Sequence, residues 1–160
     1  MSAKTEVSLL VADLRRCQAI LEKIDAFYRG LQAVELQQWG KNRATGILVA
    51  EVLVDYYTCL ETAFLRVSQF FENNLKPERW HQDLLERMSL RVEGVREPVL
   101  SDESRLLLLE LLKFRHFKRY YFEFDYDWEK LDFLLLKYER ARQGVSSDFA
   151  SFLRFLEGMT

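Results

Sequence analysis

The spacing of apolar residues over the first half of the chain constrains the fold most strongly. Apolar residues recur every three or four positions through two long stretches, which places them on one face of a helix. We predict a first helix over about residues 4–38 and a second over about residues 44–73. The predicted buried face of the first helix consists of Val7, Leu10, Val11, Leu14, Cys17, Leu21, Ile24, Phe27, Tyr28, Leu31 and Val34.

The middle of the chain predicts a short helix, a loop and a longer helix. Pro77 suits the first turn of a short helix over residues 77–88, and the segment RVEGVREPVL (residues 91–100) indicates an exposed loop. Ser101 suits the N-cap of a helix over residues 102–121. The LLLLELL run in this helix is apolar on more than one side. The helix is therefore either central in a bundle or part of a subunit interface.

The last part of the chain predicts two more helices. Asp127 suits the N-cap of a helix over residues 128–143, Gly144 is expected to end it, and a last helix follows over residues 147–156. Only two prolines and six glycines occur, too few for a hairpin-rich sheet protein. We therefore predict one all-α domain over residues 1–160. It is an up-and-down bundle of four to five main helices plus a short extra helix.

Composition limits the possible environments and partners. A formal net charge of -2 gives no general affinity for nucleic acid, so any RNA contact must come from a local patch. We expect a cytoplasmic protein, because the sequence shows neither a signal peptide nor an apolar run of about 18 residues. Cys17 and Cys59 lie far apart in the sequence, and we expect them to be small buried apolar residues without a partner cysteine.

Charges and aromatic residues converge in the segment RLLLLELLKFRHFKRYYFEFDYDWEKL. Its first part carries the cations Arg105, Lys113, Arg115, Lys118 and Arg119, and the turn that follows is acidic. Cations at the end of one helix and anions at the start of the next can simply satisfy the helix dipoles. The same pattern also fits a phosphate-binding patch with aromatic faces on which bases stack. Composition leaves both interpretations open.

The run FRHFKRYYFEFDYDWEKL resembles the signature of HepT-like proteins, a branch of the HEPN superfamily. The segments DYYTCLETAF, PERWHQDLLERM and PVLSDESRLLLLELLKFRHF follow the same family's order of features. The resemblance implies a helical bundle that forms a homodimer, with no metal and no cofactor. Active members of the family are metal-independent endoribonucleases with an Arg-x4-6-His motif. They are paired with a minimal nucleotidyltransferase (MNT) antitoxin, which binds them or adds AMP to a Tyr two residues past the motif His.

Two positions depart from the family pattern. The motif Arg corresponds to Arg115, but Tyr120 stands at the position of the catalytic His and Phe122 at that of the modified Tyr. A His with a pKa of about 6.5 can move protons at neutral pH, whereas only about one Tyr in a thousand is ionised at pH 7. Tyr120 is therefore a poor replacement for the motif His.

Several neighbours of the motif are further candidates. His116 lies one turn before Tyr120 and can replace the missing His, or it can be a polar residue at a packing or dimer surface. The basic patch suggests RNA or phosphate contacts for Lys118 and Arg119, and Arg119 is also the second basic residue of the family's run. Tyr121 can stack on a base, and it is a weak candidate for AMP transfer.

Two residues outside this segment also bear on the site. The resemblance implies that Glu61 points toward Arg115 and forms an ion pair with it; the alternative is an ordinary surface carboxylate. We assign His81 a structural role, because no cluster of His or Cys accompanies it to hold a metal.

Three functions remain open at this point. The first is a HepT-like protein with a degenerate motif, weak or inactive in RNA cleavage, which acts by binding RNA, a second copy or the nucleotidyltransferase. The second is an active endoribonuclease that uses Arg115 with His116 or Tyr120. The third is a helical adaptor unrelated to RNA, in which the basic residues only satisfy helix ends.

Overall fold

The fold is that of a computed structural model, which describes residues 2–72, 80–121 and 124–160, without the side chains of residues 120 and 121. The predicted start of the short helix at Pro77 lies outside these residues. Regular structure in the described residues is helical, apart from one antiparallel bridge between Val92 and Arg96. The predicted all-α class is confirmed. No described helix combines the length and the apolar character that crossing a membrane requires.

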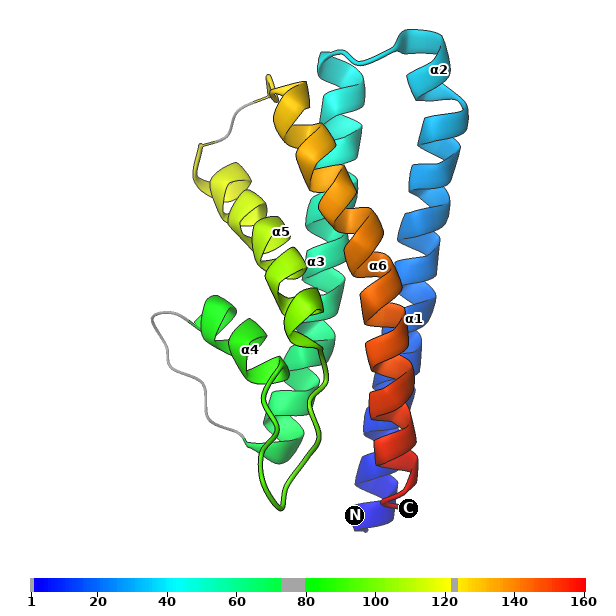
Figure 1. The fold of residues 1–160 in the computed structure, drawn as a ribbon. Coiled ribbons are helices and arrows are strands. Elements are labelled where there is room, and N and C mark those ends of the chain that lie inside the picture. Colours follow the sequence, from blue (N-terminus) through cyan, green and yellow to red (C-terminus); the bar gives the residue numbers. More distant parts are fainter. Residues whose placement is uncertain (1, 73–79, 122–123) are drawn as a thin grey trace.

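Within the described residues, four long helices and two short ones form the bundle (Figure 1). In chain order, they are α1 (Ala3–Ala33), α2 (Glu35–Trp39), α3 (Arg43–Phe71), α4 (Trp80–Met88), α5 (Asp102–Tyr121) and α6 (Trp128–Glu157). The helix α3 contacts each of the other five helices, and α1 and α6 run side by side along it. The short helix α4 packs against α3 and α5. The long helices alternate in direction, as predicted.

The central helix α3 is buried except along one stripe, because its sequence is apolar on its other sides. Its buried residues are Thr45, Gly46, Val49, Ala50, Val52, Leu53, Tyr56, Tyr57, Leu60, Glu61, Ala63, Phe64, Val67 and Ser68. Asn42 begins the helix with a capping box, in which its side chain accepts from the backbone N–H of Thr45 at 3.0 Å. The indole of Trp128 donates to the backbone oxygen of Asn42 at 3.0 Å, which ties the start of α6 to the start of α3.

The predicted break at Gly144 is wrong. Asp127 caps α6 as predicted, with its side chain accepting from the backbone N–H of Glu129 at 3.0 Å, but α6 then continues without interruption to Glu157. Gly144 faces Ser104 of α5, and a Cβ added at Gly144 would lie 2.5 Å from the Ser104 hydroxyl oxygen. This glycine therefore serves close helix packing rather than helix termination.

The first helix also departs from its prediction. A break at Val34 separates α1 from α2, where the sequence predicts one continuous helix. Phe27 and Val34, both predicted to be buried, are 53% and 47% exposed. The rest of the predicted stripe is confirmed. Its buried residues are Val7, Leu10, Leu14, Cys17, Tyr28 and Leu31, and Val11, Leu21 and Ile24 pack partly buried against the core.

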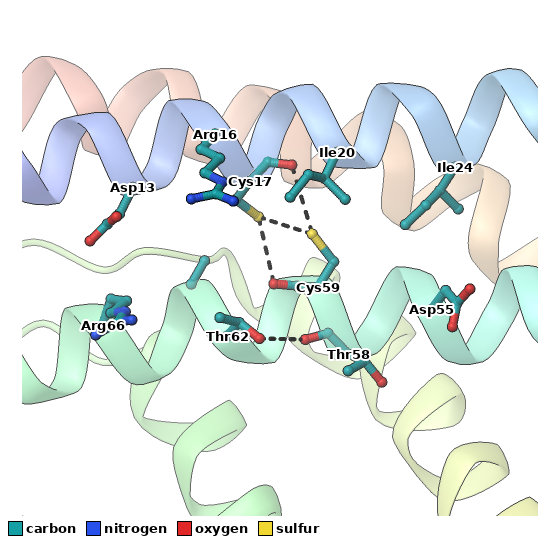
Figure 2. Close-up of a pocket in the computed structure, with 11 residues that line it drawn as sticks. Asp13, Arg16, Cys17, Ile20, Ile24, Asp55, Thr58, Cys59, Thr62 and Arg66 are labelled. Atoms are coloured by element: carbon teal, nitrogen blue, oxygen red, sulfur yellow. Dashed lines mark hydrogen bonds between the residues drawn. The ribbon is translucent and has the colours of Figure 1, made fainter.

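The expectation that the two cysteines have no partner is wrong. Cys17 of α1 and Cys59 of α3 are free thiols whose sulfur atoms lie 3.7 Å apart (Figure 2). They line a hollow of about 510 Å³ between these two helices. The contact with Cys59 raises the pKa of the Cys17 thiol, and burial raises it further. The two cysteines are far apart in the sequence, but α1 and α3 form an antiparallel hairpin that brings them together.

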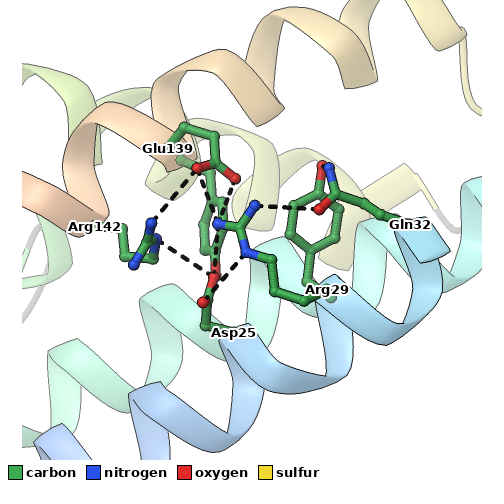
Figure 3. A network of polar contacts seen from close by, with 7 residues as sticks. Asp25, Arg29, Gln32, Glu139 and Arg142 are labelled. Carbon is green, nitrogen blue, oxygen red and sulfur yellow. Dashed lines mark hydrogen bonds and ion pairs between the residues drawn. The ribbon is translucent and has the colours of Figure 1, made fainter.

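A polar network joins α1 to α6 (Figure 3). The carboxylate of Asp25 accepts from the Tyr138 hydroxyl at 2.7 Å and from Arg29 at 3.0 Å. Arg29 also pairs with Glu139 at 2.7 Å, and Arg142 lies 3.4 Å from Asp25. Burial favours a higher pKa for Asp25, but the hydrogen bonds from Tyr138 and Arg29 outweigh it, so the pKa lies below its ordinary value.

The contact between α5 and α6 predicts that Gly144→Ala destabilises the protein. Alanine is the better helix former, yet its methyl group would collide with the Ser104 hydroxyl. We expect the free energy of unfolding to fall by about 1–3 kcal/mol. Denaturation by urea, followed by circular dichroism, measures this change.

Two controls isolate the collision. At Gly30 in α1 an added Cβ meets nothing within 4 Å, so Gly30→Ala should stabilise the protein by roughly 0.5–1 kcal/mol. In a Ser104→Ala background only the Ser104 Cβ remains, at 3.8 Å, and Gly144→Ala should then also be stabilising. A loss of stability that persists in this background would contradict the explanation.

Candidate functional site

Arg115 is held at the contact between α5 and α3. Its guanidinium donates to a carboxylate oxygen of Glu61 at 2.9 Å and to the hydroxyl oxygen of Thr58 at 3.3 Å. The guanidinium carbon also lies 5.0 Å from the centre of the Tyr57 ring, within the range of a cation–π contact. The predicted ion pair between Glu61 and Arg115 is therefore present in the structure.

This ion pair is shielded from solvent. The side chain of Glu61 is 9% exposed and that of Arg115 is 16% exposed. Burial raises the pKa of the Tyr57 hydroxyl, and the charge of Glu61 raises it further, with Arg115 acting in the opposite direction. Because a buried carboxylate is stable only with partners, Glu61 fixes the position of the guanidinium.

His81 of α4 joins the same cluster, although the sequence gives it a structural role. Its Nδ1 atom lies 2.9 Å from the Glu61 oxygen that Arg115 contacts and 3.1 Å from the Arg115 nitrogen. The Trp80 ring lies against the imidazole, with ring centres 3.6 Å apart. Three helices thus place a guanidinium, a carboxylate and an imidazole within hydrogen-bonding distance of one another.

Helical spacing is the signal that could have identified His81. Leu84, Leu85 and Met88 are the buried residues of α4. His81 precedes them by three, four and seven positions, so it shares their face of the helix and must point toward α3 and α5.

A second cation of α5 is also paired with α3. Lys118 lies 3.4 Å from Glu51, in a contact more exposed than that of Arg115. Burial raises the pKa of the nearby Asp55, and the charge of Glu51 adds to this effect while Lys118 opposes it. Arg115 and Lys118 of α5 therefore face acidic residues of α3, which is more specific than an interaction with the helix dipole alone.

The other predicted site residues lie away from this cluster or outside the described residues. His116 and Arg119 are exposed, and neither joins Arg115 in its contacts with Glu61 and Thr58. The side chains of Tyr120 and Tyr121 and the whole of Phe122 lie outside the described residues. Their predicted roles stay predictions.

The cluster brings together two chemical capacities. A guanidinium carries a permanent charge and donors suited to phosphate, and an imidazole can move protons near neutral pH. Over the residues that the structure describes, no group of three or more His, Cys, Asp or Glu is placed to hold a metal ion.

The fold and this cluster define an all-helical protein with an arginine-centred polar site at a contact of three helices. The model of a family described as HepT-like protein matches residues 48–156, which include Glu61, His81 and Arg115. The chain therefore belongs to the HepT-like family, a HEPN-type family, as the resemblance implied. No curated protein and no solved structure matches it.

The shielding of the ion pair predicts that Glu61→Ala destabilises the protein strongly. The substitution leaves the Arg115 guanidinium without its carboxylate in a largely buried place. We expect the free energy of unfolding to fall by about 3 kcal/mol. Urea denaturation of the purified variant measures the loss.

Glu51→Ala is the matched control, because it removes the carboxylate from the more exposed contact with Lys118. Its effect should stay within about 1 kcal/mol. Equal effects of the two substitutions would show that the Glu61–Arg115 pair does not hold α5 against α3.

Proposed function

We propose that the protein is the HepT-like component of a toxin–antitoxin pair and that its Arg115 site binds RNA. The observation that carries the proposal is the fixed guanidinium at the position of the family's motif Arg, with an imidazole 3.1 Å away. Glu61 and Thr58 occupy only part of the guanidinium, whose five N–H donors can also serve a phosphate. The exposed Arg119, one turn further along α5, adds positive charge on the same side.

Cleavage by the family's own route should be weak, because Tyr120 replaces the proton-transferring His. The second candidate function is an active endoribonuclease. The contact between Arg115 and His81, a histidine from a different helix, favours this second function. We also propose that the protein is cytoplasmic.

The proposed partners are a second copy of the chain and a minimal nucleotidyltransferase. Four large apolar side chains on α5 and α6 are 39% to 55% exposed, which supports a protein interface on these helices; they are Leu106, Phe117, Phe133 and Leu136. Phe122 stands where relatives carry the modified Tyr. We therefore propose that the nucleotidyltransferase acts on this protein by binding rather than by transfer of AMP.

Arg115→Ala should weaken RNA binding about tenfold or more, because it removes a charge-assisted contact to phosphate. Fluorescence anisotropy with a labelled single-stranded RNA measures Kd at fixed salt. Arg15→Ala is the control, since it removes the same charge from an exposed contact with Glu157 between α1 and α6. Equal Kd values for the two variants, or no binding by the unaltered protein, would favour the helical adaptor.

The interface on α5 and α6 predicts a homodimer. Light scattering at micromolar concentration should give twice the mass of one chain, and Leu106→Glu should shift the mass toward that of one chain. Leu9→Glu is the control, because Leu9 of α1 is similarly exposed but lies outside these two helices. A single-chain mass for the unaltered protein would exclude the homodimer.

A further inference from the structure

We infer that His81 is the proton acceptor for cleavage of RNA bound at Arg115, in place of the histidine that Tyr120 replaces. The inference rests on the proposed function, because it requires RNA at Arg115. It assigns an active role to a residue that the sequence suggests is structural. The argument depends on three features of the cluster: the protonation of the ring, its accessibility and its position relative to the guanidinium.

The surroundings of Nδ1 determine which ring nitrogen carries the proton. A carboxylate oxygen of Glu61 lies 2.9 Å from Nδ1. If Nδ1 carried no proton, its lone pair would face a lone pair of this oxygen, and the two would repel each other. A protonated Nδ1 instead donates to the carboxylate. Arg115 donates to the same oxygen, so its nitrogen lies 3.1 Å from Nδ1 because two donors converge on one acceptor. The neutral ring therefore carries its proton on Nδ1 and its lone pair on Nε2.

The ring is held in place and still accessible. Among the described residues, both polar contacts of His81 are made by Nδ1, which leaves Nε2 for another partner. The side chain of His81 is 34% exposed, whereas that of Glu61 is 9% exposed, so the ring extends from the buried carboxylate toward solvent. Packing against Trp80 restricts its rotation. A positioned imidazole with a free Nε2 is the arrangement that general base catalysis requires.

His116 does not offer this arrangement. It follows Arg115 in the sequence, so it points about 100° away around α5, and it is exposed. His81 reaches the guanidinium from α4, and a phosphate held by Arg115 would lie next to its ring. Glu61 accepts a hydrogen bond from the Nδ1–H group in both the neutral and the protonated ring, so the ring need not reorient when Nε2 takes up a proton.

The proposed step is the transesterification of RNA. Nε2 of His81 takes the proton of the 2′-hydroxyl while O2′ attacks the adjacent phosphorus. The O2′–P bond forms as the P–O5′ bond breaks, and Arg115 offsets the charge that develops on the phosphate. The products are a 2′,3′-cyclic phosphate and a 5′-hydroxyl. The leaving O5′ takes a proton from water, and the hydroxide formed receives the proton that His81 held.

The test uses the full chain and a fluorescently labelled single-stranded RNA of mixed sequence. His81→Asn is the decisive variant, because the asparagine amide can still donate to Glu61 but has no equivalent of Nε2. We expect its single-turnover cleavage rate to fall at least about 100-fold, with the Kd for RNA unchanged within a factor of about two. A matched 2′-deoxy oligonucleotide should not be cleaved.

Chemical rescue separates proton transfer from a structural role. Added imidazole should restore part of the cleavage rate to His81→Ala and none to Arg115→Ala. Circular dichroism establishes that each variant is folded, and if His81→Ala is unfolded, the folded His81→Asn protein decides the outcome.

The possible failures are distinguishable. Cleavage by His81→Asn at the unaltered rate would overturn the inference and leave His81 a structural residue. RNA binding that depends on Arg115 without any cleavage would overturn the inference but leave the proposed function standing. The absence of RNA binding that depends on Arg115 would overturn the proposed function and, with it, the inference.

Discussion

The buried carboxylate of Glu61 is the constraint that determines the arrangement of α4 and α5 around the central helix. It lies on α3, a helix that contacts all the others, in a buried place where an unpaired charge would be strongly unfavourable. Two donors compensate for its burial, the guanidinium of Arg115 and the imidazole of His81. Apolar packing alone would allow the helices to slide or rotate slightly, whereas these directional contacts fix their register. The same contacts assemble the candidate site, so the stability of the fold and the proposed function depend on one group of atoms.

The pairing of α5 with α3 also affects how the basic residues of α5 are interpreted. Charge pattern alone allows either a response to helix dipoles or a phosphate-binding patch. The structure shows that Arg115 and Lys118 are paired with Glu61 and Glu51 of α3, so neither of those interpretations is sufficient. A phosphate that binds Arg115 must share the guanidinium with Glu61. Binding should therefore be more modest than the number of cations suggests, in keeping with the small net charge of the chain.

The sequence is most informative where one physical effect dominates. The apolar spacing of α3 and α5 and the capping residues Ser101 and Asp127 correctly indicate where helices lie and begin. Gly144 misleads because a glycine can serve helix termination or close packing, and only the neighbouring Ser104 distinguishes the two. The contact between Cys17 and Cys59 depends on the register of two helices, which the apolar spacing does not specify.

The candidate site was predictable only in part. The resemblance to the family leads to Arg115 and to its pairing with Glu61. It does not lead to His81, which enters the site through the packing of α4 against α3 and α5. The sequence signal for His81 is its register with Leu84, Leu85 and Met88, because a polar residue on the apolar face of a helix points into the packing contact.

The contacts that hold Arg115 bear on how the site can change during evolution. Its contacts come from Thr58, Glu61 and His81, on α3 and α4. Position 120 is five residues further along α5, an axial rise of about 7.5 Å. Among the described residues, the side chains that contact the guanidinium belong to α3 and α4. Under the proposed function, a single substitution between His and Tyr at position 120 can therefore change the rate of cleavage while these contacts keep the guanidinium in place for RNA binding.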